Sequence, residues 1–295
     1  MPFFRLAVFL VVVNAISVSL HAYVGSRLVS LLPAGSSTAK AVWVALAALY
    51  AIMFATMFLS RWAHPALWVR ATVMTGYVWM GVVFLLLVAG LVGDSIGLVL
   101  RAAGGLSGMD FAMAARWAKI GLFATVPLLA SYGIWQALRP PEIHEVEIRV
   151  PGLAKEWDGV RIAHVTDTHV GLILRKSWVE DLVRRVDSAK PDIVVHTGDL
   201  VDGSLEGLKD DLAPISRLKG REGTFFVTGN HEGYSGIRPW CGQMRAWGWD
   251  VLANESRILT RGGAKLAVAG VTDAHEGGIR SGTAPDVAQA LSRVP

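Results

Sequence analysis

The chain has 295 residues, of which 53% are hydrophobic and 18% charged, and its mean hydropathy is +0.43. Soluble globular proteins carry about a quarter charged residues, so this composition excludes an ordinary soluble protein of this length. The single cysteine, Cys241, excludes an intrachain disulfide framework and a metal site built from several thiolates.

Charge is divided unevenly along the chain. Residues 1–140 contain nine Lys or Arg and two Asp or Glu, a net charge of +7, whereas residues 141–295 contain nineteen and twenty-two, a net charge of −3. The sequence therefore predicts two domains of different kinds, 1–140 and 141–295. The basic excess lies beside apolar stretches, and the chain has no Arg-rich arm or basic patch interleaved with aromatic residues, so no nucleic-acid partner is predicted.

The first domain contains four long stretches without Asp, Glu, Lys or Arg. They comprise 21, 20, 23 and 19 residues and cover 6–26, 41–60, 71–93 and 120–138. About 20 apolar residues in a helix cross the ~30 Å hydrocarbon core of a bilayer, and a helix satisfies its own backbone hydrogen bonds there. We therefore predict an all-α segment of four transmembrane helices in a multi-pass protein of the cell membrane.

Other interpretations of these stretches fit less well. A buried helical core would leave the domain too little polar surface. A signal peptide would explain Arg5 before "LAVFLVVV", but the uncharged run is long for one and no small-x-small cleavage site follows. The connection 93–117 is Gly-rich yet apolar, and we expect it to lie along the membrane interface or to form an irregular cap.

Four crossings return the chain to the side on which it started. The positive-inside rule favours neither side, because four basic residues lie on one face and five on the other: Arg5, Arg61, Arg70 and Arg139 against Arg27, Lys40, Arg101, Arg116 and Lys119. His21, near the end of a stretch, is the one ionisable residue within the predicted spans. This argues against a transporter, whose polar residues would line the spans.

After Pro140 and Pro141 the pattern changes to short alternating strands and helices. Strands are predicted at 144–150, 160–166, 192–197, 224–228 and 265–271. Helices are predicted at 175–190, 205–219 with a break at Pro214, 237–248 and 285–294. Such alternation is typical of a layered α/β domain, whose sites form beyond the carboxyl ends of the strands.

Three successive predicted strands end in polar clusters: "HVTDTHVG", "VVHTGDLVDG" and "FFVTGNHEGY". Side by side in one sheet, these ends would gather five side chains at one edge, namely Asp167, His169, Asp199, Asn230 and His231. Carboxylate, imidazole and carboxamide groups form a ligand set that suits Mn, Fe, Zn or Mg better than a thiolate-seeking metal. Gly198 and Gly229 each precede a proposed ligand and permit the tight turn that aims it.

The motifs "DTH", "GDLVD" and "GNHE" resemble those of the calcineurin-like metallophosphoesterase family, in particular its bacterial membrane-associated branch, over residues 160–295. The resemblance implies a two-sheet α/β sandwich and two divalent metal ions. It implies that Asp167 and His169 bind the first metal, that Asp199 bridges both, that Asn230 binds the second, and that His231 assists the leaving group.

The implied reaction is metal-assisted hydrolysis of a phosphomonoester, phosphodiester or pyrophosphate, with Mn, Fe or Zn as the metal. A membrane anchor favours a lipid-linked phosphate substrate, including a nucleotide-sugar lipid pyrophosphate such as some relatives cleave. Asp202 is expected either to hold the turn after Asp199 or to accept a hydrogen bond from a side chain that binds the metal. Glu232 is expected either to orient His231 or to be a solvated loop acid.

The sequence departs from the family pattern after His231. Members carry three further histidine ligands, one at a strand end and two in a Gly-His-x-His segment, and His275 in "GVTDAHEGG" matches neither. We therefore expect a fragment rather than a natural pseudoenzyme. The alternative function is a catalytically inactive membrane sensor or scaffold that uses the phosphoesterase-like domain for binding. His164 and His196 are interpreted as structural, and Trp240, Trp247 and Trp249 as core residues.

Overall fold

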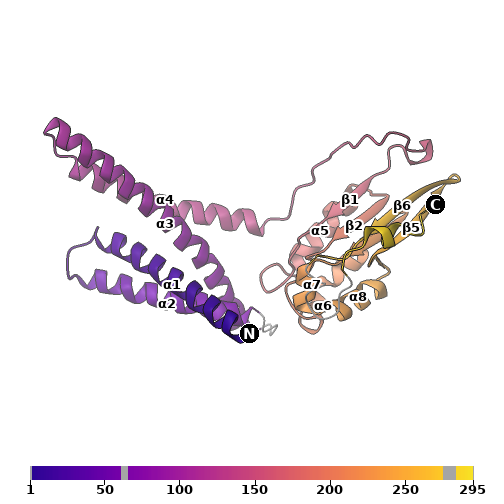
Figure 1. The fold of residues 1–295 in the computed structure, drawn as a ribbon, viewed down its shortest axis with the longest axis horizontal. Helices are drawn as coiled ribbons and strands as arrows, with labels where there is room; N and C mark the ends of the chain where they lie inside the picture. Colours follow the sequence, from indigo (N-terminus) through magenta and orange to yellow (C-terminus); the bar gives the residue numbers. More distant parts are fainter. Residues whose placement is uncertain (1, 61–65, 275–283, 295) are drawn as a thin grey trace. The chain divides into compact units, whose positions relative to one another are not determined.

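The computed structural model of the protein describes residues 2–60, 66–274 and 284–294. The chain forms two compact units, one of helices that ends at Ala137 and one that begins at Leu138. Four long apolar helices followed by an α/β domain with a parallel sheet are the fold class that the sequence predicts. Figure 1 shows the elements in chain order.

The first unit contains α1 (Pro2–Val29), α2 (Ser37–Leu59), α3 (Leu67–Ser107) and α4 (Ala112–Leu138). All four helices are long and apolar enough to cross a membrane. Many of their outward-facing side chains are large and apolar, among them Phe84, Leu128 and Trp135. Such surfaces suit lipid rather than water, and the prediction of four long apolar helices in this part of the chain is confirmed.

Small residues and a few polar contacts hold these helices together. A Cβ atom at Gly76 of α3 would lie 2.0 Å from Thr56 Oγ1 of α2, so the two helices approach as closely as glycine allows. His21 is buried, and its Nε2 atom accepts a hydrogen bond from Trp79 Nε1 at 2.9 Å, while Nδ1 lies 2.7 Å from the Ser17 carbonyl oxygen. His21 therefore joins α1 to α3 as a packing residue.

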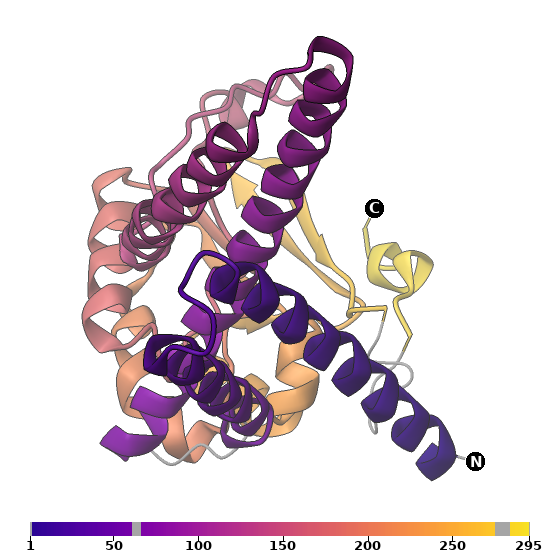
Figure 2. The same ribbon diagram turned by 90° about the vertical axis from the view of Figure 1, so that its left-hand side faces the viewer.

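The connection between the third and fourth helices differs from the expected irregular cap. Helix α3 continues to Ser107 and ends at Gly108, whose φ of +70° is the left-handed C-cap conformation. Only a short turn separates it from α4, and Figure 2 shows the two helices as a long hairpin. The prediction used charged residues as boundaries, but a charge marks where a chain leaves lipid and does not end a helix.

The second unit is a layered α/β domain. Its strands are β1 (Ile162–Val165), β2 (Ile193–Thr197), β3 (Gly223–Val227), β4 (Asp250–Val251), β5 (Glu255–Arg261) and β6 (Ala264–Gly270). Its α-helices are α5 (Lys176–Ser188), α6 (Leu205–Leu212), α7 (Asn230–Ser235), α8 (Ile237–Ala246) and α9 (Val287–Leu291), with short 3₁₀ turns η1 (Lys155–Trp157) and η2 (Ala213–Arg217). Strands β1 to β4 form a parallel sheet in that order, and β5 pairs with β6 as an antiparallel hairpin.

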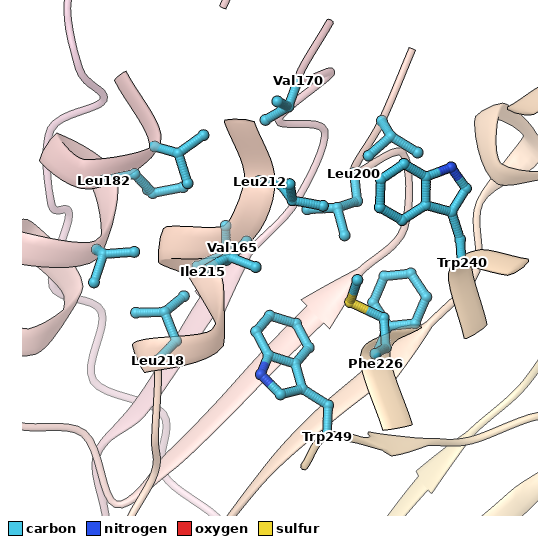
Figure 3. Close-up of a cluster of buried hydrophobic side chains, with 14 of the residues drawn as sticks. Val165, Val170, Leu182, Leu200, Leu212, Ile215, Leu218, Phe226, Trp240 and Trp249 are labelled. Carbon is cyan, nitrogen blue, oxygen red and sulfur yellow. The ribbon is translucent and has the colours of Figure 1, made fainter. Parts of the chain in front are cut away.

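The sheet is covered on both faces because its central strands are apolar on both sides. Val194 and Phe226 join the core beneath α5, α6 and α8, and Figure 3 shows the centre of this cluster. The neighbouring Ile193 and Phe225 point to the opposite face and pack with residues of the β5–β6 hairpin. Trp240 and Trp249 are buried in the first cluster, and Trp247 packs against it, which confirms their interpretation as core residues.

Three details of the second unit were not predicted correctly. The expected strand at 144–150 is wrong: the segment is exposed and outside any sheet, with Val146 79% exposed. Its alternating pattern suits a strand, but no described strand pairs with it. Strands β4 and β5 and helix α7 were not predicted, because they are short or polar.

Candidate metal centre

The three strand ends that carry polar clusters meet at one edge of the sheet. Strands β1, β2 and β3 are parallel neighbours, with Val165 opposite His196 and Thr197 opposite Val227. The pairing extends beyond the strands, because the Asp167 amide bonds the Gly198 carbonyl at 3.2 Å and the His169 amide bonds the Asp199 carbonyl at 3.0 Å. The loops after β1 and β2 are therefore tied together at the point where the predicted ligands lie.

The backbone of these loops is strained where the ligands sit. Asp167, His169 and Asp199 have φ values of +52°, +43° and +52°. Non-glycine residues rarely adopt this left-handed region, which costs of order 1 kcal/mol or more each and persists only where surrounding structure enforces it. Gly198, with a φ of +86°, gives the chain one unstrained position in the same turn. Such concentrated strain is typical of a functional site.

Three of the predicted ligands converge on a common point. His169 Nε2 lies 3.9 Å from Asp167 Oδ1 and 3.8 Å from Asp199 Oδ2. Because Zn²⁺ lies about 2.0–2.2 Å from its nitrogen and oxygen ligands, atoms that share one ion lie within about 4.4 Å of each other. Two carboxylates and one imidazole at these separations fit a divalent ion of the Mn, Fe or Zn type.

Asp202 joins two histidines behind this point. Its Oδ1 atom lies 3.0 Å from His169 Nδ1 and 2.5 Å from His231 Nδ1, and the two imidazole rings meet edge to face at 4.4 Å. These three residues could themselves be taken for a metal site. A separation of 2.5 Å fits a charge-assisted hydrogen bond better than two ligands of one ion, so we assign Asp202 as an acceptor. The Nε2 atoms of both histidines are then left for a metal or substrate.

The loop after β3 brings the remaining predicted residues to the same edge. Asn230 and His231 begin α7, and the His231 amide donates to Asp199 Oδ1 at 2.9 Å. A Cβ atom at Gly229 would lie 2.3 Å from Asp199 Oδ1, so glycine is needed for this approach. Asn230 is half-buried, directly after Gly229. The structure thus brings all five predicted ligand and catalytic residues to one edge, three of them around one point.

Glu232 has a role that neither sequence interpretation named. The side chain is buried, and it accepts hydrogen bonds from four backbone N–H groups: Gly229 at 2.7 Å, Leu200 at 2.8 Å, Asp199 at 3.0 Å and Val201 at 3.3 Å. Burial raises the pKa of the Glu232 carboxyl group, and the bonds from these amides act in the opposite direction. Glu232 is therefore neither solvated nor bonded to the His231 ring in the described contacts, but clamps the loop after β2 to the loop after β3.

Three other histidines complete the account. His196 is buried against Phe226 and Trp249, burial lowers its pKa to about 3, and its Nδ1 atom has no partner among the described residues. His196 is thus a buried residue of the core, as expected, although one of its ring nitrogens has no described partner. His164 is instead exposed on β1, with Nε2 lying 2.8 Å from Thr197 Oγ1. His275 lies outside the described residues.

Fold and site together define a class: an α/β domain with a candidate site for a divalent metal at the carboxyl edge of a parallel sheet. Residues 160–290 match the family model of the calcineurin-like phosphoesterases. The chain is thus similar to this family over residues 160–290, and members of the family use divalent metal ions.

Relatives carry the same domain. A Helicobacter pylori protein named as an uncharacterized metallophosphoesterase is 37% identical over 175 residues, 59% of this chain and 45% of the relative. A Danio rerio transmembrane protein with a metallophosphoesterase domain is 33% identical over 135 residues, 45% of this chain and 31% of the relative. The chain thus spans less than half the length of these curated relatives. No solved structure matches it.

Proposed function

We propose that the chain is a membrane-anchored phosphoesterase that binds two divalent metal ions and hydrolyses phosphate esters. The observation that carries this proposal is the convergence of Asp167, His169 and Asp199, with ligand atoms 3.8 and 3.9 Å apart, on strained loops at the carboxyl edge of the sheet. Strain of this kind, at three adjacent ligands, is difficult to explain as ordinary loop structure.

In this proposal Asp167, His169 and Asp199 hold the first ion, and Asp199 and Asn230 hold part of the second. A pair of divalent ions supplies a water of lowered pKa and neutralises charge on the phosphoryl oxygens. His231 is proposed to donate a proton from Nε2 to the leaving oxygen. Its Nδ1 bond to Asp202 fixes the ring orientation and stabilises the protonated imidazole.

We further propose a lipid-linked phosphate as the substrate class. The four apolar helices would hold the domain at a membrane surface. A groove of about 780 Å³ runs along the outer side of β1 and includes Asp167. Apolar side chains such as Ile143, Ile162 and Trp178 contribute to its lining, which suits a substrate with an apolar part.

The first test is metal content and hydrolysis of bis(p-nitrophenyl) phosphate by the purified natural full-length protein with added Mn²⁺. Asp199→Asn is compared with Asp210→Asn, an exposed aspartate in α6. Bound metal and turnover that only Asp199→Asn abolishes would support the phosphoesterase. A folded full-length protein that binds no metal and turns over no ester would favour the sensor or scaffold. A panel of lipid pyrophosphates and soluble esters tests the substrate class, which is wrong if only soluble esters are hydrolysed.

A further inference from the structure

Helix α3 is far longer than a bilayer crossing requires. At 1.5 Å per residue its 41 residues extend about 60 Å, roughly twice the hydrocarbon thickness. An ion cluster divides the helix: Asp94 bonds Arg27 of α1 and Lys119 of α4, each at 2.6 Å, and Tyr23 at 2.9 Å. Arg27 lies in the last turn of α1, so the cluster marks one end of the bundle. Residues 95–118 lie beyond it and are called here the distal hairpin.

The surface of the distal hairpin is apolar. Six of its large apolar side chains expose between 61% and 92% of their surface: Leu98, Val99, Leu106, Met109, Met113 and Trp117. On α3 these residues continue an exposed stripe that begins within the predicted span at Leu91 and Val92, with spacings of seven and eight residues that keep them on one helix face. A patch of this kind in water would be a liability, so a covering partner is expected.

The charges on the hairpin indicate what that partner is. Its ionised side chains are Arg101, Arg116 and Asp110. Asp110 is engaged in capping α4, since its Oδ1 atom accepts from the Ala112 amide at 2.8 Å. Arg116 donates to the Leu31 carbonyl oxygen at 3.0 Å, and Arg101 is exposed and has no ion pair among the described residues. Two guanidinium groups beside an apolar surface and a tryptophan fit the boundary between acyl chains and anionic headgroups.

We propose that the distal hairpin is a lipid-binding arm that lies in the headgroup region of the bilayer, with its apolar stripe toward the acyl chains and Arg101 and Arg116 on anionic phospholipid phosphates. This goes beyond phosphoesterase activity. It rests on the part of the proposed function that places the four helices in a membrane. The arm would anchor the bundle through lipid composition as well as through hydrophobicity.

The test uses the full chain in liposomes of phosphatidylcholine, with or without phosphatidylglycerol. In a Cys241→Ala background, a single cysteine labelled with an environment-sensitive fluorophore is placed by Leu106→Cys in the arm. Leu129→Cys within α4 and Lys209→Cys on the exposed surface of α6 are the controls.

We expect acyl-brominated lipid to quench the Leu106 and Leu129 probes, and aqueous iodide to quench the Lys209 probe alone. Phosphatidylglycerol should shift the Leu106 emission to shorter wavelength, and Arg101→Gln should weaken that shift severalfold while Arg5→Gln leaves it unchanged.

Each other outcome has one meaning. Iodide quenching of the Leu106 probe, with the Leu129 probe quenched by brominated lipid, would show that the arm projects into water and would overturn the inference. A Leu129 probe open to iodide would instead overturn the proposed membrane insertion. If the emission wavelength of the Leu106 probe changed neither with phosphatidylglycerol nor with Arg101→Gln, the assignment to anionic headgroups would be overturned.

Discussion

His169 and His231 are held by the same atom: their Nδ1 nitrogens lie 3.0 and 2.5 Å from Oδ1 of Asp202. One residue comes from the loop after β1 and the other from the start of α7, so a single carboxylate aligns a proposed metal ligand with the proposed proton donor. The two functions are therefore coupled through the Asp202 side chain.

Asp202→Asn should impair both functions while the domain remains folded. The neutral carboxamide orients the His169 ring poorly and no longer stabilises a protonated His231, so we expect metal affinity to fall by about 10–100-fold. Isothermal titration with Mn²⁺ and the pH profile of ester hydrolysis measure the two effects. Asp210→Asn is the control, and equal affinity and equal pH profiles in both variants would remove Asp202 from the site.

Glu232→Gln should destabilise the second unit. The carboxylate accepts from four amides, whereas glutamine replaces one acceptor oxygen by a donor and leaves two amides, those on the lost oxygen, without a partner. We expect a loss of about 2–4 kcal/mol in unfolding free energy. The thermal unfolding midpoint of the detergent-solubilised chain measures it, with the exposed Glu206→Gln as the control. An unchanged midpoint would show that solvent replaces these bonds without cost.

Gly229→Ala should disrupt the metal centre. The added Cβ would lie 2.3 Å from Asp199 Oδ1 and would push the carboxylate from its position. Gly233→Ala is a matched control in the following helix, because its Cβ meets nothing within 4 Å. We expect bound metal to fall at least tenfold in the first variant and to stay at the level of the parent chain in the second. Metal analysis after dialysis decides, and similar metal content in both would contradict the proposed approach of the loops.

His196 should make the second unit sensitive to acid. Burial lowers its pKa to about 3, whereas an unfolded histidine titrates near 6.5, so the unfolded state binds the proton first as pH falls. This stability contribution is intact above pH ~6.5 and declines by about 1.4 kcal/mol per pH unit down to the folded pKa. His196→Leu should remove about 2 kcal/mol of the loss between pH 7 and pH 5.

Hydrogen exchange of β2 peptides, corrected for intrinsic rates, measures the opening free energy at the two pH values. His144→Leu changes an exposed histidine and should leave the pH dependence of β2 as it is in the parent chain. If the opening free energy of β2 in His196→Leu still fell between pH 7 and pH 5 as much as in the parent chain, groups other than His196 would cause the acid sensitivity.

In the first unit, Gly76→Ala should separate α2 from α3. The new methyl group would lie 2.0 Å from Thr56 Oγ1, so the helices must shift or the threonine must rotate. We expect a loss of about 1–3 kcal/mol, as for overpacked cores. Gly81→Ala lies in the same helix, where a Cβ meets nothing within 4 Å, and should be neutral or slightly stabilising. Thermal unfolding in detergent compares the two, and equal midpoints would contradict the close contact.

The sequence could place the candidate site residues at one edge of the sheet because the information for this is local. Each cluster follows directly after an apolar strand, and parallel strands bring such ends to one edge, so Asp167, Asp199 and His231 could be grouped without a structure. The role of Glu232 could not be predicted. Its partners Asp199, Leu200 and Val201 lie more than thirty residues away, and the bonds go to their backbone amides, which carry no sequence signal.

The helices and strands were predicted correctly where burial of apolar residues determines the sequence pattern. They were missed where strand pairing or helix propensity determines the structure. The segment 144–150 alternates between polar and apolar residues like a strand, yet a strand requires a neighbouring strand to pair with. Among the described residues no strand pairs with this segment, and its sequence carries no sign of that. In α3 the charge of Asp94 marks the end of the predicted span, although Leu91 and Leu98 on either side of it favour continued helix.

Three of the five non-glycine residues with left-handed φ in the described chain are Asp167, His169 and Asp199. Glycine would adopt these conformations more readily than aspartate or histidine does. Selection for thermal tolerance alone should therefore favour glycine or asparagine at these positions and erode the metal centre. A library of such thermostable descendants would keep the fold while it lost the candidate metal ligands, so thermal stability and the proposed metal binding would be separable by selection.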